Sequence, residues 1–406
     1  MDAITAKVRL GRLRKLHISI LLPSCLLVLI AGLGSLRVPA PAQTAAKAAT
    51  FSFTLKYLET SGLITKIDPG QQEVKFRKEP NFGTDDKIVR RALKVGPNPG
   101  DFVGFAVNLT SHTLYLDLNQ NLDLTDDPRG VYRSENMRSS ILLSFFKGVR
   151  LSFSSGGVNR SYLLEPFYFL GENSSYIGIR SSYAGEVELQ GQKWQFQVQD
   201  NLDGQLDAQD KFLFTPVARE GEPKGIPYSP MPVPKNLFLE GHEYQLGFAF
   251  KAASGDSPLT VTFAQITSPM AELTLDGQFV RRLLLQGDRR LVILDSPSHT
   301  IPLPADNYRI RGLYLQPAPD KPALASSSET SPFVVTTGAP YRLRVGAPFV
   351  SYVTADRNGN MLRLRYILTG AAGEQYAVIN PDRGNPPKFV IYKGDQVVAT
   401  GSFQYG

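Results

Sequence analysis

Residues 358–368 read Asn-Gly-Asn-Met-Leu-Arg-Leu-Arg-Tyr-Ile-Leu, and this stretch decides the fold class. Apolar and charged side chains alternate from Leu362 to Tyr366, which is the period of two expected of a strand with one face toward a core. Asn358 and Gly359 tolerate the positive φ angles of a tight hairpin turn. The stretch therefore predicts an antiparallel hairpin.

Short runs of the same kind recur along the chain between Gly, Asn, Asp and Pro residues. Lengths of about 4–8 residues and a high content of Val, Tyr, Phe and Thr favour strands over helices. The clearest runs are 103–109, 113–116, 151–153, 194–198, 244–250, 259–263 and 362–368. Only residues 85–93 have a spacing that suggests a helix. We therefore predict an all-β, mainly antiparallel protein of several domains.

The N-terminus has the three parts of a secretory signal. Basic residues within 7–15 precede an apolar run over 18–36, and Ala-Pro-Ala follows at 40–42. This order is typical of a segment that is removed on export. The apolar run is also close to the ~18 residues that can span a bilayer. Residues 1–42 are therefore interpreted as a signal peptide, with an uncleaved membrane anchor as the alternative.

Export also changes the charge and cysteine content of the chain. Residues 1–42 hold six basic residues and one acid, so their removal takes five from the formal charge of +7 and leaves +2. They also hold Cys25, so the rest has no disulfide and no Cys-based zinc site. A nearly neutral chain lacks the electrostatic footprint of nucleic-acid binding. We expect an extracellular or envelope partner of unknown identity, no nucleic acid, and membrane contact only through an N-terminal anchor.

Two stretches predict domain boundaries. Residues 219–235 are rich in Pro, and residues 319–332 mix Pro, Ala, Ser and Asp without periodicity. They are read as linkers between a β-domain at 50–218, a β-sandwich-like module at 236–318 and a last module at 333–406. With about seven short strands, the last module resembles an immunoglobulin-like or fibronectin-like sandwich, although it lacks the Cys-Trp-Cys pattern.

An acidic loop is the strongest indication of chemistry. Residues 115–127 read Tyr-Leu-Asp-Leu-Asn-Gln-Asn-Leu-Asp-Leu-Thr-Asp-Asp, with oxygen-bearing side chains at every second position from Asp117 to Thr125. Calcium takes about six to eight oxygen ligands, which a tight loop with alternating polar residues can supply. The candidate ligands are Asp117, Asn119, Asn121, Asp123, Thr125, Asp126 and Asp127.

A second acidic loop repeats the theme. Residues 198–210 read Val-Gln-Asp-Asn-Leu-Asp-Gly-Gln-Leu-Asp-Ala-Gln-Asp, and the candidate ligands are Asn201, Asp203, Asp207 and Asp210. Both loops resemble the calcium loop of EF-hand and dockerin domains. They depart from it where Leu122 replaces the usual Gly and where Gln199 replaces the first acid. The resemblance implies structural Ca²⁺ held between strands.

Two interpretations of function follow from these features. Paired loops of this type resemble those of exported bacterial β-rich proteins of unknown function. The first interpretation is a non-enzymatic, calcium-stabilised binding or scaffolding protein of the cell envelope or extracellular space. The second is a secreted hydrolase of polysaccharide or another polymer that uses an acidic pair such as Asp126/Asp127 or Glu186/Glu188. The sequence has no Gly-x-Ser-x-Gly, His-x-x-x-His or phosphate-binding Gly-rich motif, which favours the first.

Overall fold

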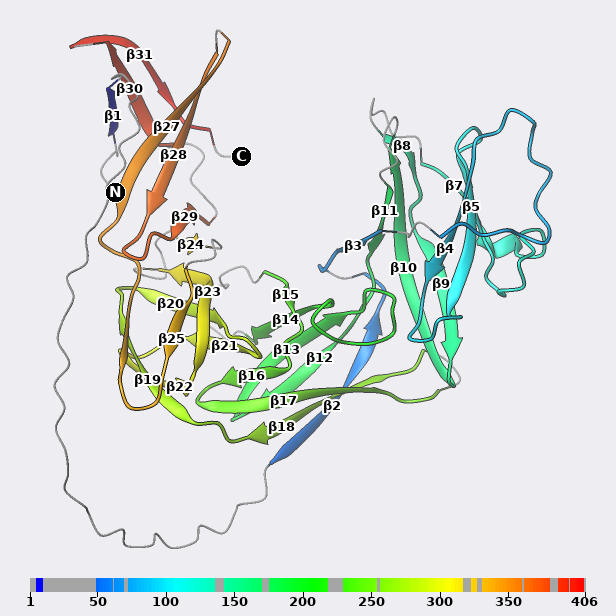
Figure 1. The fold of residues 1–406 in the computed structure, drawn as a ribbon, viewed down its shortest axis with the longest axis horizontal. Helices are drawn as coiled ribbons and strands as arrows, with labels where there is room; N and C mark the ends of the chain where they lie inside the picture. The colour runs from blue at the N-terminus through cyan, green and yellow to red at the C-terminus, as the bar shows by residue number, and fades with distance from the viewer. Residues whose placement is uncertain are drawn as a thin grey trace, which may run out of the picture.

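The computed structural model shows a protein built of β-strands (Figure 1). It describes residues 5–9, 49–60, 62–68, 72–135, 142–169, 175–217, 229–253, 256–316, 323–326, 331–359, 361–379, 386–393 and 395–404. Within these ranges the one helical element is the short turn η1 (Pro128–Gly130). The strands pair mostly antiparallel in several sheets, which confirms the predicted fold class. Of the predicted signal segment, only β1 (Thr5–Arg9) is described, and the rest of 1–42 lies outside the described residues.

The helix suggested for residues 85–93 is wrong. Ile88–Lys94 form strand β4, and every residue of it is paired with β5 (Phe102–Asn108). The β-branched residues Ile88 and Val89 favour a pleated strand over a helix. Pairing with a neighbouring strand therefore outweighs the local spacing.

Two sheets pack face to face to form a unit that we call the sandwich. One sheet has the order β4-β5-β6-β7, and the other has β3-β11-β10-β8 with β9 paired to β10. Residues such as Phe105 and Leu114 of the first sheet share a core with Leu151 and Ile179 of the second. The remaining strands are β3 (Thr65–Ile67), β6 (Thr113–Leu116), β7 (Val131–Arg133), β8 (Leu142–Phe145), β9 (Val149–Ser155), β10 (Val158–Phe169) and β11 (Ser175–Ile179).

A second unit, which we call the central sheet, carries the largest aromatic core. Its strand order is β15-β14-β13-β12-β2-β18-β17-β16. Trp194 is buried there and stacks on Phe214, with ring centroids 4.7 Å apart. The strands are β2 (Thr50–Leu58), β12 (Ser182–Leu189), β13 (Gln192–Gln199), β14 (Lys211–Pro216), β15 (Met231–Pro232), β16 (Asn236–Leu239), β17 (His242–Phe250) and β18 (Leu259–Ile266).

The connectivity differs from the simple linear order that the sequence suggests. β2 pairs with β12 on one side and with β18 on the other, so the regions 50–218 and 236–318 share the central sheet. The sandwich is inserted between β2 and β12 and lies at one end of the molecule (Figure 1). Residues 219–228 of the stretch read as a linker lie outside the described residues.

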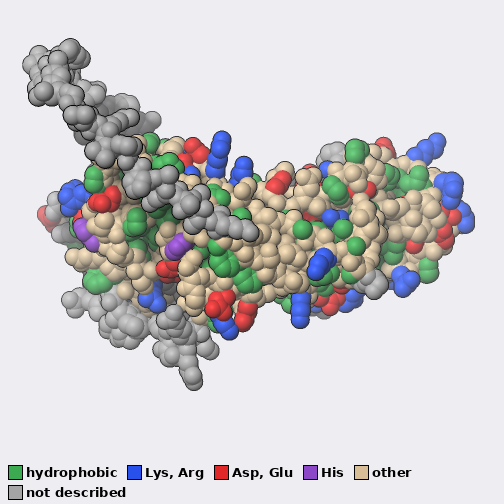
Figure 2. Space-filling model, turned by 90° about the horizontal axis from the view of Figure 1, so that it is seen from below, with side chains coloured by type: hydrophobic (Ala, Val, Ile, Leu, Met, Phe, Trp, Pro, Cys, Tyr) green, Lys and Arg blue, Asp and Glu red, His purple; other side chains and the backbone are tan. Residues whose placement is uncertain are grey.

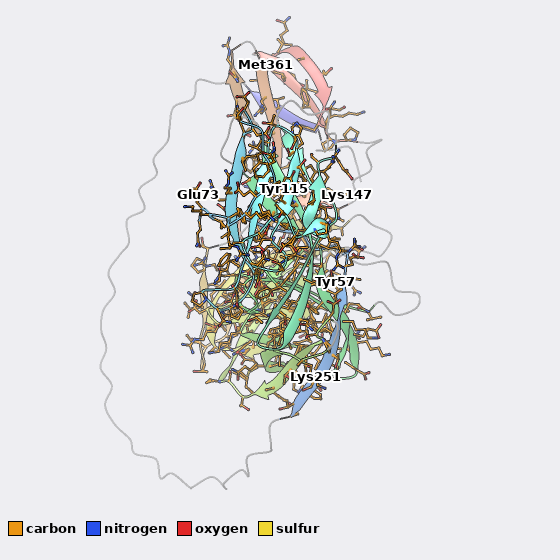
Figure 3. All side chains as sticks on the ribbon, turned by 90° about the vertical axis from the view of Figure 1, so that its right-hand side faces the viewer. Tyr57, Glu73, Tyr115, Lys147, Lys251 and Met361 are labelled. Atoms are coloured by element: carbon orange, nitrogen blue, oxygen red, sulfur yellow. The ribbon has the colours of Figure 1, made fainter. Side chains whose placement is uncertain are left out.

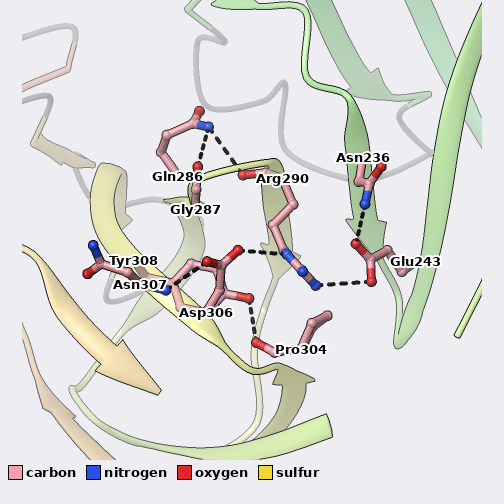
Figure 4. Close-up of polar contacts among 9 residues, drawn as sticks. All are labelled: Asn236, Glu243, Gln286, Gly287, Arg290, Pro304, Asp306, Asn307 and Tyr308. Carbon is pink, nitrogen blue, oxygen red and sulfur yellow. Dashed lines mark hydrogen bonds and ion pairs between the residues drawn. The ribbon is translucent and has the colours of Figure 1, made fainter. Parts of the chain in front are cut away.

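A third unit continues from β16, which pairs parallel with β21. Its core is separate from the other two and includes Leu273, Leu285 and Tyr308. Beside it, Arg290 forms ion pairs with Glu243 at 3.0 Å and Asp306 at 2.8 Å (Figure 4). Its strands are β19 (Met270–Asp276), β20 (Val280–Gln286), β21 (Arg290–Asp295), β22 (Thr300–Pro304), β23 (Asp306–Leu315), β24 (Leu324–Ser326), β25 (Phe333–Val335) and β26 (Tyr341–Arg344).

The last strands include the hairpin predicted from residues 358–368. β27 (Val350–Asn358) and β28 (Met361–Thr369) pair over their whole length, and Gly359 between them has φ +58°. Met361 is 72% exposed near the tip (Figure 3). β29 (Gln375–Val378), β30 (Lys388–Lys393) and β31 (Gln396–Ser402) complete the chain, and β1 pairs parallel with β30.

The outer surface carries charges of both signs. Lys and Arg side chains are interspersed with Asp and Glu on the face shown in Figure 2. Within the described residues, no helix is long and apolar enough to cross a membrane.

Candidate calcium loops

Both acidic loops occupy the same kind of position. Loop 1 (residues 117–127) follows β6 directly and leads through η1 into β7, and loop 2 (residues 200–210) follows β13 directly and leads into β14. In each case the two flanking strands are antiparallel neighbours. Each loop is therefore the connection of a hairpin, flanked by strands as the sequence predicts.

Asp117 organises the first half of loop 1. Its side chain is fully buried, and its two carboxylate oxygens accept the main-chain N–H groups of Asn121 at 3.0 Å and Leu122 at 2.9 Å. The chain folds around this carboxylate because Gln120 and Leu122 adopt φ +58° and +63°. Such angles are uncommon for residues other than Gly. Leu122 thus makes the turn for which the calcium-loop template uses Gly.

Asp126 and Asp127 close loop 1. Asp127 accepts the main-chain N–H of Leu118 at 3.0 Å. Asp126 accepts the side-chain amides of Asn119 at 3.1 Å and Asn121 at 2.7 Å. The loop therefore gathers Asn119, Asn121 and Asp126 through direct side-chain contacts.

Asp123 and Thr125 are hydrogen-bonded to each other. The Asp123 carboxylate accepts the main-chain N–H of Thr125 at 2.8 Å and its hydroxyl at 2.6 Å, and it lies 3.6 Å from the Lys78 ammonium. The hydrogen bonds from Thr125 lower the pKa of Asp123. Of the seven candidates in loop 1, these two are engaged with each other and with Lys78.

Loop 2 begins with Asp200, a residue that we did not select from the sequence. Its side chain is buried and accepts the N–H groups of Leu202 at 2.8 Å and Gly204 at 3.2 Å. It also accepts the hydroxyl of Tyr162 at 2.9 Å. Asp200 therefore has the role that Asp117 has in loop 1, and the residue before it, Gln199, ends β13.

Asp210 closes loop 2 as Asp127 closes loop 1. Its carboxylate accepts the N–H groups of Asn201 and Asp207, both at 2.7 Å. The opening and closing aspartates are ten residues apart in both loops, because Asp117 and Asp127 have the same separation as Asp200 and Asp210.

Asn201, Asp203 and Asp207 support the main chain of loop 2. Their side-chain oxygens accept N–H groups two residues ahead, from Asp203 at 3.0 Å, Gln205 at 2.9 Å and Gln209 at 2.8 Å. This is the hydrogen bond of an Asx-turn, which bends the chain locally. Asn119 and Asn121 make the same bond in loop 1. The two loops therefore share a local structure as well as a composition.

Burial makes the ionised form of these carboxylates costly. It raises the pKa of Asp200 to about 6 and that of Asp210 to about 7. The neighbouring acid Asp203 adds to both shifts. Burial also raises the pKa of Asp127 in loop 1. Loop 2 therefore concentrates negative charge where solvent screens it poorly.

The ligand types fit a hard cation. Within the described parts of the chain, no three His, Cys, Asp or Glu side chains form a group that could hold a metal ion. Calcium at either loop would therefore draw on Asn amides and main-chain carbonyls as well as carboxylates, and it commonly uses all three. Asp117, Asn119, Asn121, Asp126 and Asp127 could supply these oxygens in loop 1, and Asp200, Asn201, Asp203 and Asp210 in loop 2.

Neither acidic pair considered for hydrolysis lines the open pocket beside residues 204–208. Glu186 and Glu188 are both exposed on β12, where Gln195 donates to Glu186 at 3.1 Å. Asp126 and Asp127 are occupied with closing loop 1. Comparison with known proteins adds no further guide to function: no family model, no curated protein and no solved structure matches this chain.

Proposed function

We propose that this is an exported, non-enzymatic protein of the cell envelope or extracellular space that binds or scaffolds a partner there. Its β-sheet units are stabilised by Ca²⁺ in loops 1 and 2. The metal acts as a structural clip between neighbouring strands and takes no part in catalysis. The signal-like segment 1–42 supports export, and the neutral balance of the remaining chain fits the absence of a nucleic-acid partner.

One observation carries the calcium proposal. Both loops place an aspartate directly after a strand, wrap the main chain around its carboxylate, and close on a second aspartate ten residues later. An ordinary hairpin turn needs only two to five residues and no buried acid. Burial of these carboxylates is unfavourable, and a bound cation at each loop would offset that cost.

The raised pKa values support the same conclusion. A divalent cation favours the ionised form of Asp200 and Asp210, which burial alone disfavours. Calcium modules that work outside the cell bind at about 10⁻⁴–10⁻³ M, which matches calcium concentrations there.

Thermal unfolding of the secreted chain tests the proposal. A site with a dissociation constant of ~0.1 mM adds about 1.8 kcal/mol at ~2 mM calcium, because only the folded protein binds. We expect the unfolding temperature to rise in calcium relative to EDTA, with a smaller effect of magnesium. Asp210→Asn should remove the part of the rise due to loop 2, whereas the exposed control Glu186→Gln should keep all of it. Equal unfolding temperatures in calcium and EDTA would make both loops ordinary turns.

A further inference from the structure

Loop 2 contacts the cores of two different units, whereas the leucines of loop 1 contact only cores formed by the sandwich strands. Leu202 is fully buried in the core of the sandwich, together with Tyr162 and Ile179. Leu206, four residues later, packs against the core of the central sheet. One short loop therefore has a side chain in each of two units.

The residues next to Leu202 attach loop 2 to the sandwich by hydrogen bonds. The Gln199 side-chain amide donates to the carbonyl oxygens of Ile179 at 3.1 Å and Ser181 at 2.8 Å. Asp200 accepts the hydroxyl of Tyr162, which lies in β10 of the sandwich. The start of loop 2 is therefore held firmly by the sandwich.

Arg160 connects the middle of loop 2 to both units. It belongs to β10, is 6% exposed, and donates to the carbonyl oxygen of Gly204 at 3.3 Å. Its guanidinium lies over the ring of Phe250 in β17, 4.5 Å from the centroid. Nε and Nη1 are buried without a hydrogen-bond acceptor in the described structure.

The far half of loop 2 borders an open space. An open pocket of about 610 Å³ is lined by residues 204–208, by residues 233–235, and by residues 246–248 and 250 of β17. Loop 2 is therefore packed against the sandwich on one side, and on the other side Leu206 contacts the core of the central sheet beside this open space.

We infer that loop 2 is the joint that fixes the sandwich on the central sheet, and that a divalent cation at this loop tightens the joint. The second part rests on the proposed function; the first part does not. Besides the loop-2 contacts, the sandwich is attached by its two chain connections, by Lys211 of β14, which donates to the carbonyl oxygen of Ile64, and by contacts of β10 with residues 250–257. The last group includes the hydrogen bonds of Asn159 to Ser257 and Ala253. A pivot about those contacts is the motion that the joint suppresses.

Energy transfer between two dyes on the full secreted chain tests the inference. The chain beyond residue 42 has no cysteine, so Arg133→Cys on the sandwich and Gln245→Cys on the central sheet give two unique labelling sites. Both positions are exposed. We expect a narrow distribution of transfer efficiencies in calcium and a broader one in EDTA. Leu202→Ala should give the broad distribution in both conditions.

A matched control separates loss of the joint from loss of stability. Leu118→Ala in loop 1 removes a side chain that packs against the same sandwich core but does not touch the joint, and its distribution should stay narrow. If the Leu202→Ala variant does not fold, the experiment uses Leu206→Ala instead, because the Leu206 side chain is only half-buried. A narrow distribution in both Leu202→Ala and Leu206→Ala would overturn the inference.

The same measurement distinguishes failure of this inference from failure of the proposed function. If calcium raises the unfolding temperature but leaves the distribution unchanged, the cation does not act on the joint and that part of the inference is wrong. If calcium has no effect on stability while Leu202→Ala broadens the distribution, the joint stands and the calcium proposal fails.

Discussion

Loops 1 and 2 have the same local structure in different surroundings. Loop 1 lies on the outer face of the sandwich, where Leu124 packs into a small core with Val74 and Phe76. Loop 2 lies between the sandwich and the central sheet and has a side chain in the core of each. The comparison shows that a loop sequence specifies a turn and a set of side-chain oxygens, whereas the position of the loop in the fold decides which units it connects.

Replacement of the first aspartate of each loop, Asp200 or Asp117, should give the largest difference in stability between the two loops. Asp200→Ala leaves three donors without this acceptor, two of them buried, and we expect it to lower the free energy of unfolding by about 3 kcal/mol. Asp117→Ala leaves only the N–H of Leu122 without an acceptor, because the N–H of Asn121 keeps its bond to Asn119, and we expect a loss of about 1–2 kcal/mol.

The single tryptophan gives a local measurement of this effect. Trp194 is buried in the central sheet, so its fluorescence in urea follows the unfolding of that unit. Asp200→Ala should lower the urea midpoint of the Trp194 signal, whereas Asp117→Ala should lower only the midpoint of a probe placed on the sandwich. Equal shifts of the Trp194 midpoint in both variants would contradict the difference between the loops.

The pH dependence of stability should come mainly from loop 2. Burial raises the pKa of Asp200 to about 6 and that of Asp210 to about 7, above the value of ~3.9 for an unfolded Asp. Between these values the folded protein binds more protons than the unfolded chain, so stability falls as pH rises from ~4 to ~7. For Asp200 alone, the raised pKa corresponds to a loss of about 3 kcal/mol in the free energy of unfolding.

Urea unfolding in EDTA from pH 4 to pH 8 measures this loss. Asp210→Asn should flatten the upper part of the profile, because it removes the group with the higher pKa. Calcium should oppose the loss by favouring the ionised carboxylates. Stability that is constant or rises over this range in EDTA would show that both groups ionise in the folded protein without cost.

The strands were predictable because their pattern is local. Alternation and β-branched or aromatic residues identified β5, β6, β13, β17, β18 and β28. The pairing of β2 with β12 and β18 was not predictable, because no short-range pattern states which distant strand completes a sheet. For the same reason the sequence suggested linear domains, although the sandwich is inserted between β2 and β12.

The acidic loops were predictable as loops, but one of the aspartates that shape them, Asp200, was not selected. A fixed calcium-loop spacing places the first acid five residues before the turn residue, as Asp117 stands before Leu122. Asp200 stands only four residues before Gly204, so the template selected Gln199 instead. The position directly after a strand, which Asp117 and Asp200 share, is the signal that would have found Asp200.

Substitutions at positions with positive φ should have the smallest effects on stability, and the effects in the two loops should have opposite signs. Gly204 has φ +73°, and a Cβ there would meet Pro97 Cδ at 3.0 Å and the Arg160 guanidinium at 3.3 Å. Gly204→Ala should therefore destabilise the protein by about 1–2 kcal/mol, from backbone strain and crowding at the joint. Its Trp194 midpoint in urea should fall.

At loop 1, a change to glycine at a position with positive φ should stabilise the protein. Gln120 is exposed and has φ +58°, so Gln120→Gly removes backbone strain without loss of a buried side chain. The gain should be at most about 1 kcal/mol, because Gly also increases the entropy of the unfolded chain. The midpoint of a sandwich probe in urea should rise slightly, and that of Trp194 should stay constant. A fall in the sandwich midpoint would mean that the Gln120 side chain, and not the backbone turn, stabilises loop 1.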